Sequence, residues 1–103
     1  MKKVVDGLVY DTEKAELIHE WNNHYPCNDF RAFSERLYKT KNGRFFLHGR
    51  GGAMSSYRSS YGDSYGSGEE IMPMTESEVV EWLSAHDGVA IILETFPESV
   101  EEA

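Results

Sequence analysis

Cys27 is the only cysteine of the 103-residue chain and the first residue to consider as a reactive group. It follows His24 by three residues in a stretch that also contains Pro26, a composition typical of a loop. A thiolate acts as a nucleophile only when a base lies within hydrogen-bond distance and a third group orients that base. No such third group is evident nearby, so we do not expect catalysis at Cys27. A single cysteine also forms no disulfide within one chain, which is typical of a reducing compartment.

The histidines, glycines and carboxylates form no strong catalytic motif. The GRGG stretch at residues 49–52 lacks the following Lys and helix of a phosphate-binding loop, and we expect a turn or bulge there. Most carboxylates fall on the expected outer face of a helix or near the C-terminus, where solvated, ionised side chains are the rule. We therefore expect no enzymatic activity and no small-molecule substrate. No metal or other cofactor is expected either, because the histidines lack the close spacing of common metal sites; they are His19, His24, His48 and His86.

Charge is distributed unevenly along the chain, whose net charge is -8. Residues 31–58 contain seven Lys or Arg and one acid, Glu35, whereas residues 59–103 contain eleven acids and no Lys or Arg. This separation creates an electric field that steers partners, and an acidic half favours a basic protein surface over nucleic acid. The simpler interpretation is that the acidic side chains only keep a small protein in solution.

The basic segment offers an alternative, a β-ribbon that reads nucleic acid. The eleven acids of the following segment would repel a phosphate backbone, so direct nucleic-acid binding is the less favoured hypothesis. The residues that suggest such a ribbon are Arg36, Lys39, Lys41, Arg44 and Arg50, together with Tyr38, Phe45 and Phe46.

The elements that position these groups are organised around a β-hairpin at residues 37–50. Asn42-Gly43 joins two runs of aromatic and branched residues, and Asn-Gly is the strongest short-range signal for a two-residue hairpin turn. With these two residues in the turn, the predicted pairs are Lys39 with Phe46, Tyr38 with Leu47, Leu37 with His48 and Glu35 with Arg50.

The N-terminal segments are expected to supply the neighbours of this hairpin. Residues 3–10 predict a strand or a short hairpin that is broken at Asp6-Gly7. Residues 12–22 fit both a helix and a strand, because their apolar residues follow both periods. We favour the strand, since a two-stranded hairpin alone is only marginally stable.

Residues 53–70 contain six Ser, three Tyr and three Gly, which predicts a long flexible loop. Its tyrosines, Tyr57, Tyr61 and Tyr65, are spaced by four residues, and Tyr with Ser and Gly is typical of adaptable binding surfaces. A flexible linker without any contact role is the alternative.

The C-terminal part contains the clearest helix signal. Thr75 and Glu78 form a capping box, which predicts a helix over residues 76–86 that packs on the sheet. The apolar run at 89–96 predicts the last strand, and residues 97–103 predict a frayed acidic tail.

The chain is thus expected to form one domain, 1–103, of the α+β class. We expect an antiparallel sheet of four to five strands, a meander around the 37–50 hairpin, packed by one C-terminal helix. No apolar run is long enough to span a bilayer and no signal peptide is evident, so a cytoplasmic protein without a membrane partner is expected.

Four stretches carry a resemblance to a known family: residues 10–18 (YDTEKAELI), 29–30 (DF), 37–57 (LYKTKNGRFFLHGRGGAMSSY) and 71–83 (IMPMTESEVVEWL). With these stretches the chain resembles a family of small proteins carried by phages and conjugative elements, with which anti-CRISPR activity is associated. The family pattern has an opening YDT-x-x-A, a central LY-x-x-K-x-G-x-x-FL-x-G-x-GG and a late I-x-P-L-T-x-x-E-A-x-x-W. This chain departs from it at Met74, where the pattern has Leu, and at Val79-Val80, where it has Glu-Ala.

The resemblance implies an anti-CRISPR inhibitor that binds a CRISPR effector complex stoichiometrically in the cytoplasm of a bacterial host. Such effectors hold nucleic acid in positively charged channels, so an acidic surface could mimic nucleic acid and block DNA binding or cleavage. The expected partner-binding residues are Asp63, Glu69, Glu70, Glu76, Glu78, Glu81, Tyr57, Tyr61 and Tyr65.

Two other classes of function stay open. One is a nucleic-acid-binding accessory protein of a mobile element that uses the basic hairpin. The other is an enzyme that modifies the effector, which would act at substoichiometric amounts. A strand at the sheet edge could also support a homodimer.

Overall fold

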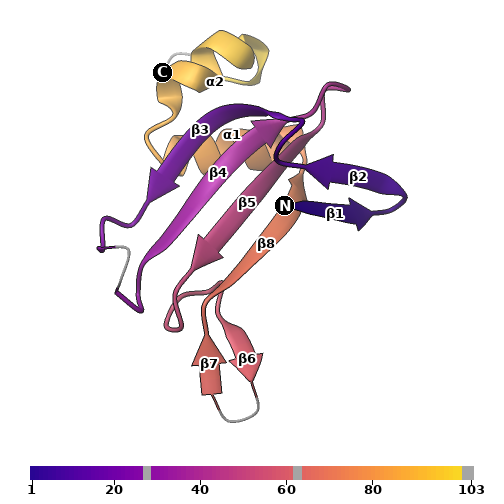
Figure 1. Ribbon diagram of the computed structural model, residues 1–103. Helices are drawn as coiled ribbons and strands as arrows, with labels where there is room; N and C mark the ends of the chain where they lie inside the picture. Colours follow the sequence, from indigo (N-terminus) through magenta and orange to yellow (C-terminus); the bar gives the residue numbers. More distant parts are fainter. Residues whose placement is uncertain (27–28, 62–63, 101–103) are drawn as a thin grey trace.

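A four-stranded antiparallel sheet in the order β3-β4-β5-β8 is the frame of the protein. The structure, a computed structural model, describes residues 1–26, 29–61 and 64–100 (Figure 1). The expectation of an α+β fold with an antiparallel sheet and a C-terminal helix is confirmed. The sheet strands are β3 (Glu16–Asn22), β4 (Phe33–Lys39), β5 (Phe45–Gly51) and β8 (Gly68–Met74).

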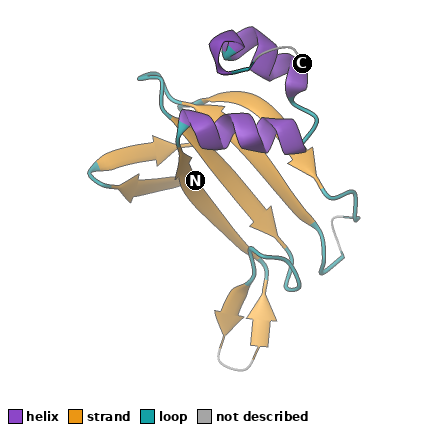
Figure 2. Ribbon diagram, turned by 180° about the vertical axis from the view of Figure 1, so that it is seen from behind, coloured by secondary structure: helices purple, strands orange, loops and turns teal. Residues whose placement is uncertain are grey.

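Two small hairpins and three helical segments complete the fold. The described helices lie on one face of the sheet, and α1 crosses the strands there (Figure 2); none of them lies on the opposite face. The hairpins are β1 (Lys2–Val5) with β2 (Leu8–Asp11), and β6 (Ser59–Tyr61) with β7 (Ser64–Gly66). The helical segments are α1 (Glu76–Ala85), α2 (Val89–Thr95) and the short 3-10 helix η1 (Pro97–Ser99).

The central hairpin is confirmed, but the predicted register is wrong by one residue. Leu37 faces Leu47, and Glu35 faces Gly49. The reason is the turn: Thr40 pairs with Arg44, so the loop holds three residues, and only Gly43 has a positive φ, of 81°. A three-residue loop that ends in a left-handed Gly is the second common hairpin solution.

The two ambiguous N-terminal segments both form strands. The preference for a strand over residues 12–22 is confirmed by β3, which pairs with β4. The hairpin broken at Asp6-Gly7 is also present, because both residues have a positive φ, as a type I′ turn requires. Sheet pairing therefore overrides the helix propensity of this part of the chain.

The flexible loop predicted over residues 53–70 is wrong in two places: the β6-β7 hairpin lies inside it, and its C-terminal end belongs to β8. Gly68–Met74 forms β8, an edge strand that pairs along β5 from Gly51 to Phe45. Its alternation explains the pairing, because Met72 faces the helices while Ile71 is buried on the other face. The many Ser and Gly residues around 53–68 predict a loop, and composition alone therefore gives no sign of this strand.

The capping-box helix is confirmed, and the strand predicted at 89–96 is wrong. The Thr75 side chain accepts from the Glu78 amide, and Glu78 accepts in return from the Thr75 amide. After α1 the chain turns at His86 and Asp87 and forms α2; Ile92 of α2 and its C-cap residue Phe96 lie four residues apart and are both buried. Helical spacing thus explains their burial.

The frayed tail predicted from residue 97 is wrong for its first part. Pro97–Ser99 forms η1, and Val100 packs against the helix-side cluster. The remaining residues of that prediction, 101–103, lie outside the described residues.

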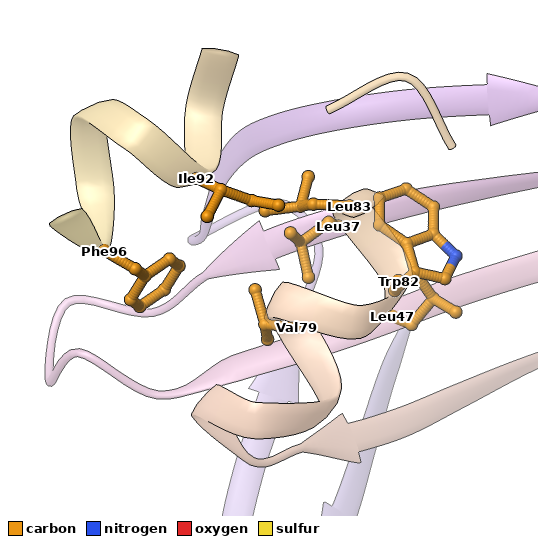
Figure 3. Packing of buried hydrophobic residues seen from close by; sticks show 7 residues of the cluster. All are labelled: Leu37, Leu47, Val79, Trp82, Leu83, Ile92 and Phe96. Atoms are coloured by element: carbon orange, nitrogen blue, oxygen red, sulfur yellow. The ribbon is translucent and has the colours of Figure 1, made fainter. Parts of the chain in front are cut away.

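Two hydrophobic clusters lie on opposite faces of the sheet. On the helix side, Leu37 and Leu47 meet residues from α1 and α2 (Figure 3). On the other face, Tyr10 of the N-terminal hairpin packs edge to face on Phe46, which stacks on Tyr38. Strand alternation assigns consecutive residues of β5 to opposite clusters. The helix-side cluster comprises Leu37, Leu47, Val79, Trp82, Leu83, Ile92 and Phe96.

Among the described helices, none is long and apolar enough to cross a membrane.

Candidate functional site

The outer surface of α1 is acidic. Val79, Trp82 and Leu83 turn inward, so the helix presents its glutamates to solvent. Glu76, Glu78 and Glu81 are all exposed. No basic residue lies in the last turn of α1. Of the nine partner-binding residues predicted, these three lie together on one helix.

Glu78 differs from its neighbours because it belongs to the cap. Its carboxylate accepts the Thr75 amide at 3.0 Å, and the hydrogen bonds from Thr75 lower the pKa of Glu78. Its charge therefore stabilises the start of α1 as well as contributing to the acidic surface. A substitution at Glu78 would change helix stability and surface charge together.

The structure separates the other acids predicted for this surface. Glu69 and Glu70 are consecutive in β8, so their side chains leave the sheet on opposite faces. Glu69 lies on the face without helices and contacts His48 at 3.1 Å. Asp63 lies outside the described residues.

Of the three tyrosines predicted as contacts, Tyr57 is the one whose side chain the structure describes. Tyr57 is half-buried, and its hydroxyl donates to Glu35. The backbones of Tyr61 and Tyr65 lie in β6 and β7, and their side chains lie outside the description. Tyr57 therefore acts inside the fold, contrary to its predicted role in an adaptable loop.

Around Glu35 lies a cluster of polar side chains that the sequence did not reveal. The Trp82 indole N–H donates to Glu35 Oε1 at 3.2 Å, and the Tyr57 hydroxyl donates to Oε2. His86 Nε2 lies 3.7 Å from Oε1, and its Nδ1 carries a proton because it donates to the Trp82 carbonyl at 2.7 Å. The carboxylate is thus held between a strand, a loop and a helix.

Gly49 makes room for the Tyr57 ring. In the observed register Gly49 stands opposite Glu35, and a Cβ on Gly49 would overlap the ring. Burial, and then the hydrogen bond to Glu35, raise the pKa of Tyr57. The phenol therefore stays protonated and serves as a donor. One signal could have found this cluster: Glu35 is the single acid among residues 31–58.

A partly buried carboxylate beside an imidazole and a phenol could in principle perform acid–base chemistry. Here the donors to Glu35 are protein groups, and Trp82, only 8% exposed, covers it. The arrangement joins the loop at 53–58 and α1 to the sheet. We therefore assign it a structural role.

The opposite face of the sheet is polar below the Tyr10 cluster and contains an open hollow of about 750 Å³. Asn22, Ser34, Arg50 and Glu69 stand side by side across the four strands of this face. Arg36 follows Ser34 by two residues along β4 and lies on the same face, where it forms an ion pair with Glu20 at 2.7 Å. This hollow is the second place on the molecule where a ligand could be held.

The basic residues of the hairpin do not form a continuous surface. Lys39 lies over the Phe45 ring on the helix side, whereas Arg36 and Arg50 lie on the opposite face. Lys41 and Arg44 are exposed at the turn. A β-ribbon reader would need these cations on one side of the strands.

Reactive and metal-binding residues do not gather elsewhere in the described ranges. Within residues 1–26, 29–61 and 64–100, no three His, Asp or Glu side chains are grouped as a metal site. Cys27 lies outside these ranges.

Comparison of the chain with models of known protein families, with curated proteins and with solved structures finds no match.

Proposed function

We propose that this protein is a stoichiometric inhibitor of a CRISPR effector complex and that it binds the effector through the acidic outer surface of α1. The observation that carries this proposal is the exposure of Glu76, Glu78 and Glu81 on one helix. The family resemblance of the sequence supplies the class of partner. The inhibitor would act in the cytoplasm of a bacterial host.

Electrostatics support a basic partner surface. Residues 59–103 carry eleven acids and no Lys or Arg, so the helical part of the molecule is uniformly negative in sequence. Effector complexes bind nucleic acid in positively charged channels, and a rigid acidic helix is complementary to such a channel. Competition with DNA for these contacts would then block target binding or cleavage.

Binding rather than catalysis is supported by the internal use of the best acid–base group. Glu35 accepts from Tyr57 and Trp82 and lies beneath the helix. Inhibition should therefore require about one protein molecule per effector complex, unlike the substoichiometric action of an enzyme.

The test is a DNA-cleavage assay with purified, guide-loaded effector complexes of several types, titrated with this protein. We expect inhibition of at least one type to saturate near equimolar amounts. The double variant E76K/E81K should weaken inhibition about tenfold or more, since like charges at an interface cost several kcal/mol. Glu78 is kept in this variant because its carboxylate caps α1.

The matched control is E13K/E16K, which makes the same change in net charge at two exposed residues outside α1. Its inhibition should stay within about twofold of the unmodified protein if the surface of α1 makes the contact. An equal loss of inhibition in both variants would show that the net charge of the protein, and not the surface of α1, determines the effect. Inhibition at strongly substoichiometric amounts, or none with any effector type, would overturn the proposal.

A further inference from the structure

A row of hydrogen-bond donors crosses the face of the sheet opposite α1. Asn22 of β3 faces Ser34 of β4, and Ser34 faces Arg50 of β5. Register partners on adjacent strands point to the same face and lie about 5 Å apart. The three side chains therefore form one line of donors across three strands.

Each of these side chains has a donor group that can still form a hydrogen bond to a ligand. Asn22 Oδ1 accepts the His24 amide at 2.8 Å, which leaves the Asn22 NH₂ group to donate. Within the described part of the chain, neither the Ser34 hydroxyl nor the Arg50 guanidinium forms a side-chain hydrogen bond or an ion pair. A guanidinium with a hydroxyl beside it is a common arrangement for an oxyanion.

The neighbouring charged side chains already contact other groups. Arg36 is bound to Glu20 at 2.7 Å, and Glu69 contacts His48 at 3.1 Å. The Arg31 guanidinium, which lies over the Tyr25 ring, binds Asp29 at 2.9 Å, and this contact lowers the pKa of Asp29 to about 2. Arg50 is thus the one cation lining the hollow, among the described residues, whose charge is not matched by a contacting carboxylate.

The hollow itself has the size of a small-molecule site. Its volume of about 750 Å³ lies within the usual range for ligand pockets. The backbone of Gly51, Gly52 and Gly68 forms part of its wall, and Tyr25 lies at its edge. This combination offers a charged end for an anion and, for an organic group, an aromatic ring that the Arg31 guanidinium covers on one face at 4.3 Å.

We propose that this hollow binds a small organic phosphate, with Arg50 and Ser34 on the phosphate and Asn22 on a neighbouring oxygen of the ligand. A long polyanion fits less well, because Glu69 stands opposite Arg50 at the β8 end of the donor row, Glu20 lies opposite Arg36 in the next row, and the chain carries a net charge of -8. The site lies on the opposite face from α1 and is independent of the inhibitor surface.

The test is a ¹H–¹⁵N NMR titration of the full chain with adenosine monophosphate, inorganic phosphate and adenosine as separate probes. Adenosine monophosphate should cause saturable shifts in the amides of Ser34, Arg50 and Gly51. Inorganic phosphate should shift the same amides more weakly, and adenosine should leave them unchanged. The variant E76K/E81K should bind adenosine monophosphate as the unmodified protein does.

Two substitutions should move the affinity in opposite directions. Arg50→Ala should weaken adenosine monophosphate binding about tenfold or more, whereas the control Arg44→Ala, at the exposed turn, should change it less than about twofold. Glu69→Gln keeps an acceptor for His48 but removes a negative charge from the lining, and should strengthen binding.

Three results would overturn the proposal: no saturable shift with either phosphate probe, equal losses in the two arginine variants, or equal shifts with adenosine and adenosine monophosphate. A DNA duplex that shifts the same amides at lower concentration than adenosine monophosphate would assign the face to nucleic acid instead.

Discussion

At the scale of single residues, Glu35 is the centre of the fold. It is the only acid among residues 31–58, yet it makes no ion pair with the cations that surround it in sequence. Instead it accepts from Tyr57 and Trp82 on the helix side of the sheet. A carboxylate removed from water requires such donors, because leaving it unpaired would cost several kcal/mol.

Gly49 and Tyr57 should be energetically coupled. Gly49→Ala places a methyl group where the Tyr57 ring lies, so we expect a loss of about 2 kcal/mol in the free energy of unfolding. In a Tyr57→Ala background the same change should cost much less, because the obstacle is gone. Denaturant unfolding of the four proteins of this double-mutant cycle measures the coupling. Additive losses would contradict the assigned packing.

The raised pKa of Tyr57 predicts a loss of stability in alkaline solution. In the unfolded chain a tyrosine ionises near pH ~10, whereas burial and Glu35 keep the folded Tyr57 protonated to higher pH. Its stabilising effect is thus complete below pH ~10 and is lost above it, by at most about 1.4 kcal/mol per pH unit.

The measurement is the difference in unfolding free energy between the unmodified protein and Tyr57→Phe. This difference should be constant between about pH 7 and 9 and shrink above pH ~10. The comparison removes the contribution of the other tyrosines, because both proteins contain them. A difference that stays constant up to pH ~11 would refute the raised pKa.

At the scale of elements, the turn of the central hairpin determines which side chains meet. The three-residue loop at 41–43 shifts the register by one relative to a two-residue turn, and this shift places Gly49 rather than Arg50 opposite Glu35. A two-residue turn would have offered Glu35 an ion pair. The observed turn instead opens the space above Gly49 for Tyr57.

This turn can be tested by comparing two neighbouring substitutions. Gly43 has a φ of 81° and Asn42 has no positive φ, so Gly43→Ala should cost about 1 kcal/mol and Asn42→Ala less than about 0.5 kcal/mol. Equilibrium unfolding measures both. A two-residue type I′ turn would require positive φ at both positions, so similar losses in the two variants would favour it.

Elements with a local chemical signature could be predicted, and elements defined by distant contacts could not. Thr75 and Glu78 fix the start of α1 within four residues, so the sequence pattern sufficed. The apolar run at 89–96 fits a buried strand and a buried helix equally well. Only the packing of Ile92 and Phe96 in the helix-side cluster decides between the two. β8 was missed because pairing with β5, rather than composition, makes it a strand.

The same distinction applies to the candidate sites. The acidic surface of α1 follows from a helix with glutamates outside and apolar residues inside, which the sequence contains in full. The Glu35 cluster joins three segments far apart in the chain, and the donor row depends on a register that the Asn-Gly signal assigns wrongly. Neither could be derived before the strands were aligned.

At the scale of the whole molecule, the two faces of the sheet differ in what covers them. The helices lie on one face (Figure 2), and on the other face Tyr10 of the N-terminal hairpin packs on Phe46. At the β8 edge, the Lys3 ammonium donates to the Ile71 carbonyl at 3.3 Å, and Pro73 lacks an amide to donate. Both features hinder the addition of another strand at β8, so a homodimer formed by sheet extension would use β3.

Tyr10 should hold the N-terminal hairpin on the sheet. It is 5% exposed, whereas its neighbour Val9 is 61% exposed. Tyr10→Ala should speed hydrogen exchange in β1 and β2 more than in β4, and Val9→Ala should leave both nearly unchanged. Exchange measured by mass spectrometry checks this. Equal acceleration of all strands by Tyr10→Ala would show that the hairpin opens only together with the sheet.

The position of α1 and α2 after the sheet in sequence sets the order in which the two clusters can close during synthesis. Tyr10, Tyr38, Phe46 and Ile71 are all made before α1 begins, so the cluster under the N-terminal hairpin can assemble first. Leu37 and Leu47 must wait for Ile92 and Phe96. At roughly 5–20 residues per second, synthesis of the ~20 residues between β8 and Phe96 takes about 1–4 seconds, and during this time the helix-side face of the nascent sheet is not fully covered. A growing chain of this protein thus exposes an apolar surface to chaperones on the ribosome that the finished molecule conceals.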